Sequence, residues 1–315
     1  MLPELPENLE AAAEEVRRNC LQALAAPYFQ ELEMRLQHSG QADDACVRAI
    51  AAVNDELATL EPMKRLLTAF GGEIAGGIGE RFLVLKTILR SLPSVSTLNV
   101  AGGVKRYFYE SFQDFAVNEA SHAWCRAGRF SFVVICKKAT LRIFPGGEFY
   151  WEISGFPRSW LKLIPPRSLS AALLFFATKF KGFAPAFFFH LDPGRRVRAL
   201  SPATLNACYL LMAECLELQP EIKGILTIGW LHSPDTHAIS PHLAWRNQAI
   251  AENGGFVSRI NGPVEHELVF HRSPERRKAF EAGRFTPTNG LVLWASADMR
   301  KWAAAQRKAA TGTGT

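Results

Sequence analysis

Hydrophobic positions follow one period in the first 126 residues and another in the rest of the chain. Within 41–60, Val47, Ile50, Val53 and Leu57 recur at three- and four-residue spacings, which is typical of one face of an α-helix. Similar patterns predict helices over 7–36, 62–92 and 104–126, interrupted by Pro27 and by glycine pairs at 71–72 and 76–77. The first 126 residues are therefore expected to be mainly helical.

From about residue 127, short β-branched and aromatic runs appear between helical segments. They predict strands over 130–135, 139–144, 148–153, 186–190, 224–231, 256–260, 267–270 and 289–294. Helices are expected over 168–180, 201–218, 240–252 and 274–283, with Ser201 and Ser240 as N-caps. The alternation over 186–260 predicts parallel strands of one sheet, joined by right-handed crossovers.

Together the two patterns predict an α/β chain of the α+β kind. We expect a mainly helical region over 1–126 and an α/β domain over 127–305, with a mixed central sheet flanked by helices. The Thr- and Gly-rich segment 306–315 is expected to be a disordered tail. A chain of 315 residues that is 48% hydrophobic can bury a large core, as one domain or as two.

Charge is distributed unevenly between the two regions. Residues 1–61 carry a net charge of −8, and residues 62–315 carry +14. A basic C-terminal region suits a small-molecule substrate or cofactor that is anionic. Nucleic acid is not expected as a partner, because no recognised nucleic-acid-binding signature is present.

Cysteine spacing and hydropathy predict the cellular compartment of the protein. No two of the six cysteines are spaced C-x-x-C, so we expect reduced thiols rather than disulfides or a zinc site. The N-terminus is acidic and lacks the pattern of a secretory signal. The most apolar stretch, 168–190, is interrupted by Lys179, Lys181 and Pro185, so no membrane span is expected. A cytoplasmic location is the expectation.

The order of elements resembles the GNAT acyltransferase superfamily over residues 130–295. A β-hairpin is followed by a strand ending at His190, a basic loop, a helix, a second strand, another helix and a closing antiparallel strand. Residues 273–280, Ser-Pro-Glu-Arg-Arg-Lys-Ala-Phe, also resemble the VirK/YbjX group of uncharacterised bacterial proteins.

The GNAT resemblance implies a thioester donor, either acyl-CoA or an acyl carrier protein. In that family a basic, glycine-bearing loop before a helix N-terminus holds the CoA pyrophosphate, because the free N–H groups there attract anions. The matching residues are Gly194, Arg195, Arg196 and Arg198. Val197, Arg198 and Leu200 stand where the family has small residues, which is a departure from its pattern.

Two histidines follow consecutive predicted strands and are candidates for catalysis. His190 ends the strand at 186–190 and His232 follows the strand at 224–231, so both are expected at the carboxyl edge of the sheet, facing one cleft. A neutral imidazole there can take a proton from an amine or hydroxyl nucleophile. Alternatively, His190, His232, Asp235 and His237 could bind iron or zinc. A third interpretation is that these residues only bond to loop backbone.

These observations favour an acyltransferase of small-molecule biosynthesis, which moves an acyl group from a thioester to an amine or hydroxyl. The metal-dependent enzyme is the first alternative. A binding protein that keeps a GNAT-like fold without catalysis is the second.

Overall fold

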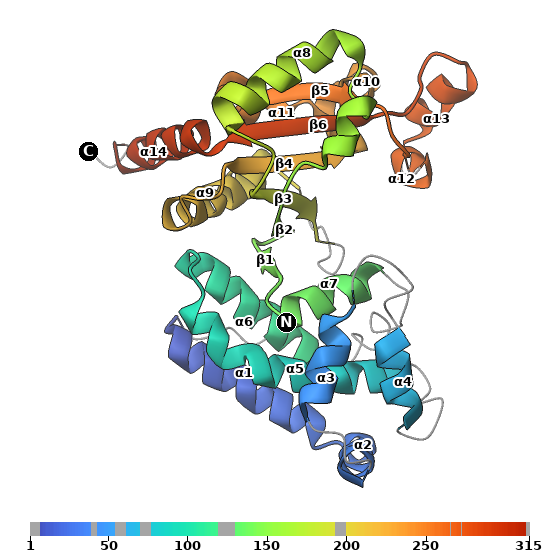
Figure 1. The fold of residues 1–315 in the computed structure, drawn as a ribbon, viewed down its shortest axis with the longest axis vertical. Helices are drawn as coiled ribbons and strands as arrows, with labels where there is room; N and C mark the ends of the chain where they lie inside the picture. Colours follow the sequence, from blue (N-terminus) through green and yellow to red (C-terminus); the bar gives the residue numbers. More distant parts are fainter. Residues whose placement is uncertain are drawn as a thin grey trace. The chain divides into compact units, whose positions relative to one another are not determined.

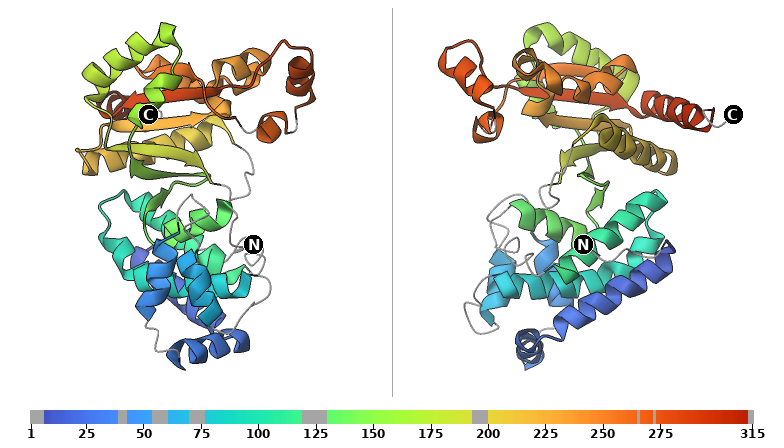
Figure 2. Two further views of the ribbon diagram at one scale, coloured as in Figure 1. Left: turned by 45° about the vertical axis from the view of Figure 1, so that its right-hand side comes forward. Right: turned by 180° about the vertical axis from the view of Figure 1, so that it is seen from behind.

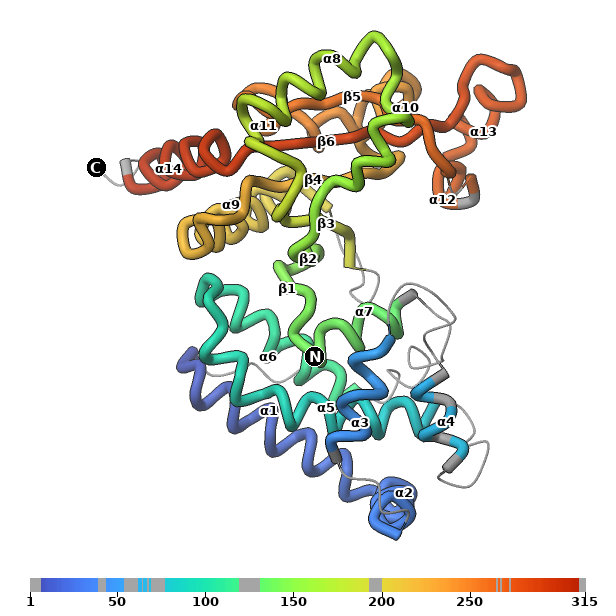
Figure 3. The backbone as a smooth tube through the Cα atoms, viewed as in Figure 1, coloured from blue at the N-terminus to red at the C-terminus, as the bar shows by residue number. Residues whose placement is uncertain are grey.

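The structure is a computed structural model that describes residues 7–38, 43–53, 61–69, 77–118, 130–192, 200–264, 266–271 and 273–312. Its contacts divide the chain into two compact units, Met1–Tyr150 with Leu191–Ala199, and Trp151–His190 with Leu200–Thr315. Figure 3 traces the chain through both units. The expected boundary at residue 126 lies outside the described residues, and the division by contacts comes later, after Tyr150.

The first unit is mainly helical, as the sequence predicts. Its first six helices are α1 (Leu9–Leu24), α2 (Pro27–His38), α3 (Asp43–Ala51), α4 (Glu61–Ala69), α5 (Ile78–Thr97) and α6 (Gly102–Val117). Asn8 caps α1 by accepting hydrogen bonds from the N–H groups of Glu10 and Ala11. The break expected at Pro27 separates α1 from α2, and the glycine pair at 71–72 lies outside the described residues.

Residues 130–135 form a helix rather than the predicted strand. Helix α7 (Phe130–Ala139) packs against α3, α5 and the short strand β1 (Ile143–Pro145). Most of its side chains are buried, and even Lys137 and Lys138 are only 8% and 5% exposed. A continuous apolar run of this length has no periodicity that separates a buried helix from a strand, and tertiary packing decides between them.

The strands form one mixed sheet in the order β1-β2-β3-β4-β6-β5. The remaining strands are β2 (Phe149–Ser154), β3 (Ala186–Leu191), β4 (Gly224–Gly229), β5 (Phe256–Ile260) and β6 (Asn289–Ala295). Strand β3 is parallel to β4, and β6 is antiparallel to both β4 and β5. The mixed central sheet with flanking helices is thus confirmed, as is the parallel pairing of β3 with β4 (Figure 1).

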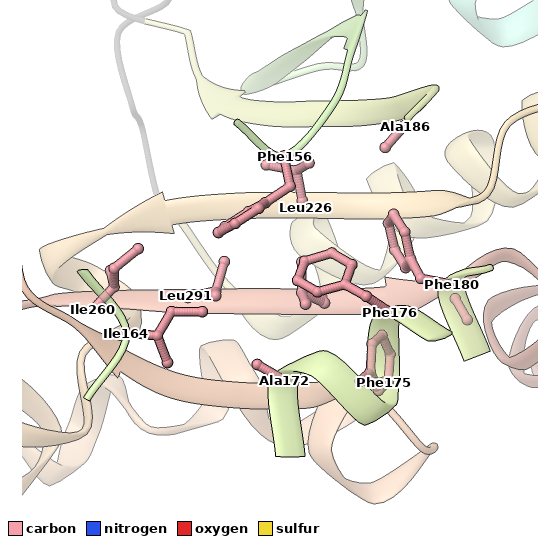
Figure 4. Close-up of a cluster of buried hydrophobic side chains, with 12 residues drawn as sticks. Phe156, Ile164, Ala172, Phe175, Phe176, Phe180, Ala186, Leu226, Ile260 and Leu291 are labelled. Atoms are coloured by element: carbon pink, nitrogen blue, oxygen red, sulfur yellow. The ribbon is translucent and has the colours of Figure 1, made fainter. Parts of the chain in front are cut away.

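Helices cover both faces of the sheet in the second unit (Figure 2). On one face, α8 (Pro166–Phe175) and a π-helical turn (Phe176–Phe180) pack on Leu226, Leu291 and Leu293 in a phenylalanine-rich core (Figure 4). On the other face, α9 (Pro202–Leu218) packs against α14 (Ser296–Gly312) and α11 (Trp245–Glu252). Helix α14 is regular as far as Gly312, within the segment expected to be a tail.

The predicted helix over 240–252 is instead two short elements, and a further helix that was not predicted precedes them. In chain order the three are α10 (Pro234–Ile239), a 3₁₀ turn (Pro241–Leu243) and α11. The Ser240 hydroxyl does not cap a helix but accepts a hydrogen bond from Arg276 Nη1 at 3.0 Å. The expected N-cap was therefore wrong, because a distant arginine uses that hydroxyl.

An excursion between β5 and β6 contains α12 (His266–Phe270) and α13 (Pro274–Glu281) (Figure 3). Residues 267–270, predicted as a strand, belong to α12. Arg276 is buried, lies 5.0 Å above the ring of Trp230 and donates from Nε to the carbonyl of Val269 at 2.6 Å. That bond satisfies a carbonyl at the end of α12, where the helix itself provides no donor.

Candidate functional site at the carboxyl end of β4

The parallel strands β3 and β4 part after a short stretch of pairing. Among the described residues their ladder contains two register pairs, Phe187 with Ile225 and Phe188 with Leu226. Strand β4 continues to Gly229, where it pairs with β6 on its other side. The last three residues of β4 therefore lie beyond the end of the ladder with β3. Carboxyl ends of parallel strands are where ligands bind in open α/β sheets.

Two glycines face each other across β4 and β6 at this edge. Gly229 pairs with Gly290, and a Cβ on Gly229 would meet no atom within 4 Å. A Cβ on Gly290 would instead lie 2.1 Å from the carbonyl oxygen of His232 and 2.6 Å from the backbone nitrogen of Ser233. The backbone at His232 thus rests directly on Gly290, and the space beside Gly229 is open.

His232 is held by a reciprocal pair of hydrogen bonds with Asn247 of α11. The side-chain Nδ2 of Asn247 donates to the carbonyl oxygen of His232 at 2.9 Å, and His232 Nδ1 lies 2.8 Å from Asn247 Oδ1. Because Nδ2 is the donor of the amide, Oδ1 accepts, and the imidazole proton resides on Nδ1. The ring is therefore oriented with Nε2 as its proton acceptor.

Burial keeps the His232 ring neutral. The side chain is 8% exposed, and desolvation is the main cause that lowers its pKa from 6.5 to about 4. The bond to Asn247 opposes this shift, and the nearby charges of Arg246 and His237 add to it. At neutral pH the imidazole carries no charge and can accept a proton.

His190 lies on the other face of the sheet. Side chains alternate along a strand, so His190 shares a face with Phe188, whose ring centroid is 4.3 Å away and which packs on Trp160. Phe189 points to the opposite face and contacts Tyr209 of α9. His190 Nε2 is 3.8 Å from Glu152 Oε1. The structure therefore does not bring His190 and His232 together in one cleft.

The other residues of the predicted metal site also have separate protein partners. His237 Nε2 is 2.8 Å from the carbonyl oxygen of Leu231. Asp235 Oδ2 accepts a hydrogen bond from Thr288 at 2.7 Å and lies 3.4 Å from Arg259 Nη1. In the described part of the chain no three His, Cys, Asp or Glu side chains are grouped to hold a metal ion.

The predicted donor-binding loop precedes α9. Gly194, Arg195, Arg196 and Arg198 lie outside the described residues. The helix after the loop begins as predicted, with Ser201 as the N-cap of α9 and Pro202 in its first turn. Ser201 accepts from the N–H of Thr204, and the Thr204 hydroxyl accepts from the N–H of Ser201. This capping box uses N–H donors that the resemblance assigned to a phosphate.

Two residues that the sequence analysis did not select are buried on the His232 side of the sheet. They are Tyr209 of α9 and Arg246 of α11. A sequence signal for the second was present, because Arg246 and Asn247 share a helix face with Ile250 at three- and four-residue spacings. Charged and amide side chains on a buried face indicate a polar role.

Comparisons with known proteins place few limits on this site. No family model matches the chain, and no curated protein matches it. A solved structure described as "The crystal structure of acyltransferase in complex with decanoyl-CoA" is similar to 93% of this chain and 90% of its own, with 12% identity and a TM-score of 0.48. Within the described residues, no helix is long and apolar enough to cross a membrane.

Proposed function

We propose that the protein is an acyltransferase that moves an acyl group from a thioester to an amine or hydroxyl of a small molecule. The observation that carries the proposal is the parting of β3 and β4 toward the carboxyl end of β4, the strand that His232 follows. Strand ends that stop pairing offer backbone N–H and C=O groups to a ligand, here a thioester and its pantetheine arm. The open space beside Gly229 lies at the same edge.

In the proposed reaction the acceptor's nitrogen or oxygen attacks the thioester carbonyl carbon. A new amide or ester bond forms, the carbon–sulfur bond breaks, and the thiolate leaves. His232 Nε2 accepts the proton of the attacking group and returns it to the thiolate, so the imidazole ends neutral. A backbone N–H beyond the β3–β4 ladder stabilises the oxyanion of the tetrahedral intermediate.

In this proposal the basic loop before α9 supplies the positive charge that binds the thioester donor. Arg195, Arg196 and Arg198 attract the phosphates of CoA or of a phosphopantetheine carrier. The capping box at Ser201 already occupies two backbone donors at the start of α9. The arginine side chains therefore provide most of the phosphate contacts.

Ligand-dependent thermal unfolding tests the proposal. CoA, acetyl-CoA, a medium-chain acyl-CoA and acyl-pantetheine are compared with iron and zinc added after chelation. A ligand at 100 times its dissociation constant adds about 2.7 kcal/mol to the free energy of unfolding. We expect stabilisation by the thioesters. Stabilisation by a metal alone would favour the metal-dependent alternative, and binding without turnover of any acceptor would favour the binding protein.

Matched variants assign the donor site. The triple substitution Arg195→Ala, Arg196→Ala, Arg198→Ala is compared with Lys162→Ala, Arg167→Ala, Arg277→Ala, which removes the same charge from exposed positions. We expect the first to weaken acetyl-CoA binding at least tenfold and the second to change it less than threefold. Equal effects would mean that the affinity for acetyl-CoA depends on the net charge of the protein rather than on the arginines of the loop.

A further inference from the structure

Two buried polar atoms on the His232 side of the sheet, Arg246 Nε and the Tyr209 hydroxyl oxygen, are without hydrogen-bond partners. Arg246 is 5% exposed, and its Nε has no acceptor. Tyr209 is fully buried, and its hydroxyl has neither a donor nor an acceptor. Among the described residues no carboxylate forms an ion pair with Arg246. A buried guanidinium is normally paired, so this one is an exception that needs an explanation.

Arg246 links Tyr209 to the candidate catalytic histidine, because its charge acts on His232 and on the Tyr209 phenol. Arg246 directly precedes Asn247, which holds the His232 ring, and α11 contacts α9. The Tyr209 ring packs edge-to-face on Trp294 of β6, with centroids 5.6 Å apart. Trp294 pairs with Ile225 of β4, and alternate residues share a face, so Tyr209 covers the same face as Gly229.

The surroundings of Arg246 favour a ligand with a negative charge. Its guanidinium stacks 4.9 Å from the ring centroid of Trp245, which leaves the planar edge with its N–H donors for another partner. Burial lowers the pKa of Arg246, and the nearby Tyr209 phenol opposes that shift. An unpaired buried charge costs free energy that an anionic ligand recovers on binding.

We propose that Arg246 and Tyr209 bind a carboxylate of the substrate next to His232. The proposal rests on the acyltransferase function and narrows its substrate class to compounds with a carboxylate. Guanidinium N–H groups donate to one or both carboxylate oxygens, and the Tyr209 hydroxyl donates a further hydrogen bond. Arg246 and Tyr209 are desolvated before the ligand arrives, so on binding only the carboxylate loses its hydration.

Carboxylate binding would also make His232 a stronger base. The charge of Arg246 is one of the causes that lower the pKa of His232, along with burial and the neighbouring His237, while Asn247 opposes them. A bound carboxylate compensates the Arg246 charge and so raises that pKa. Substrate binding and base strength are thereby coupled through a single arginine.

The carboxylate can belong to the acceptor or to the acyl chain, and two pairs of probes separate these sources. Leucine is compared with leucinamide for the acceptor, and succinyl-CoA with acetyl-CoA for the acyl chain. Calorimetric titration measures each dissociation constant. We expect one pair to show at least tenfold tighter binding of the carboxylate. If neither pair shows a preference, the proposal is wrong.

Three variants test the residues themselves. Arg246→Gln should reduce the preference for the carboxylate to less than threefold. Tyr209→Phe removes a hydroxyl that has no partner, so it should fold with an unchanged or higher melting temperature and still lose binding severalfold. Arg277→Gln, at an exposed position of α13, should keep the full preference. A preference retained in both Arg246→Gln and Tyr209→Phe would overturn the assignment.

These experiments distinguish a failure of the carboxylate site from a failure of the proposed acyl transfer. If acetyl-CoA binds the wild-type protein and neither carboxylate is preferred, acyl transfer stands and the carboxylate site does not. If leucine is preferred over leucinamide in an Arg246-dependent way but no thioester binds, the anion site stands and acyl transfer does not.

Discussion

His232 and Asn247 bond to each other twice, once through the imidazole at 2.8 Å and once through the His232 carbonyl at 2.9 Å. One amide side chain therefore fixes both the backbone and the tautomer of a histidine 15 positions earlier in the chain. The pairing ties α11 to the turn after β4, and it leaves Nε2 rather than Nδ1 as the proton acceptor of the ring. Several consequences of this arrangement are measurable.

Replacing Asn247 with Ala should destabilise the protein and disorder the His232 ring. The substitution leaves a buried carbonyl and a buried ring N–H without partners, at a cost of about 1–3 kcal/mol for each group. Urea denaturation measures the loss, and Gln248→Ala at the exposed neighbouring position should change stability by less than about 0.5 kcal/mol. Equal stability of the two variants would show that the pairing with His232 contributes nothing.

The pKa of His232 predicts how stability depends on pH. The ring titrates near 6.5 in the unfolded chain and at about 4 in the folded one, so the unfolded state binds the proton more readily. The contribution of His232 to stability is complete above pH 6.5 and is lost as pH falls toward 4. The loss is on the order of 3 kcal/mol, because a tenfold difference in proton affinity between the two states corresponds to about 1.4 kcal/mol.

A pair of variants isolates this titration. The free energies of unfolding of wild type and His232→Asn, measured by urea denaturation between about pH 7.5 and about pH 4.5, should converge in acid. Only the wild type loses stability as pH falls, because the variant lacks the imidazole. His242→Asn, at an exposed position, should follow the wild type throughout. Parallel curves for wild type and His232→Asn would contradict the low pKa.

Gly229 and Gly290 should respond oppositely to the same substitution. At Gly290 a Cβ would overlap the backbone of His232, which cannot move aside as a flexible side chain could, so Gly290→Ala should cost at least about 1–3 kcal/mol. At Gly229 the backbone is extended and the space is open, so Gly229→Ala should fold with nearly wild-type stability. Thermal unfolding of the two variants checks both expectations.

The Gly229 variants also probe the ligand. If a thioester occupies the open space, Gly229→Val should weaken acetyl-CoA binding while the melting temperature stays within a few degrees of wild type. Calorimetric titration and thermal unfolding measure the two quantities separately. Unchanged affinity in a well-folded Gly229→Val protein would place the thioester elsewhere.

The sequence predicted much of the fold where local signals were strong. Ser201 and Pro202 identified the start of α9, and the apolar run at 224–231 identified β4 to within two residues. Predictions failed where tertiary contacts decide the structure. The apolar run at 130–135 becomes a helix because its neighbours bury most of its surface, and Ser240 bonds to Arg276, which lies 36 positions further along the chain.

The candidate site was predictable in part. His232 was identifiable because it follows a strand at the edge where ligands bind. Its partner Asn247, and Tyr209 and Arg246 nearby, come from two different helices, and helix packing brings them to the strand. A single sequence indicates which helix face is buried but not which strand end that face covers. His190 was misplaced for a related reason, since strand register decides the face of the sheet.

The buried ion pair of Lys138 and Asp192 should be a main determinant of stability in the first unit. Asp192 follows β3, is fully buried and accepts a hydrogen bond from Lys138 Nζ of α7, while its backbone N–H donates to the carbonyl of Glu148 at 3.0 Å. Removing one partner of a buried pair leaves the other charge desolvated, at a cost of about 3–5 kcal/mol.

Lys138→Met keeps the length of the side chain and removes its charge, so it should lower the free energy of unfolding by about 3–5 kcal/mol. Lys301→Met, at an exposed position of α14, is the control for the loss of one lysine. The double substitution Lys138→Met, Asp192→Asn removes both charges and should recover part of the loss, because the buried negative charge is removed as well. Denaturant unfolding of the three variants measures these differences. A loss equal in Lys138→Met and Lys301→Met, with no recovery in the double variant, would show that the pair does not stabilise the unit.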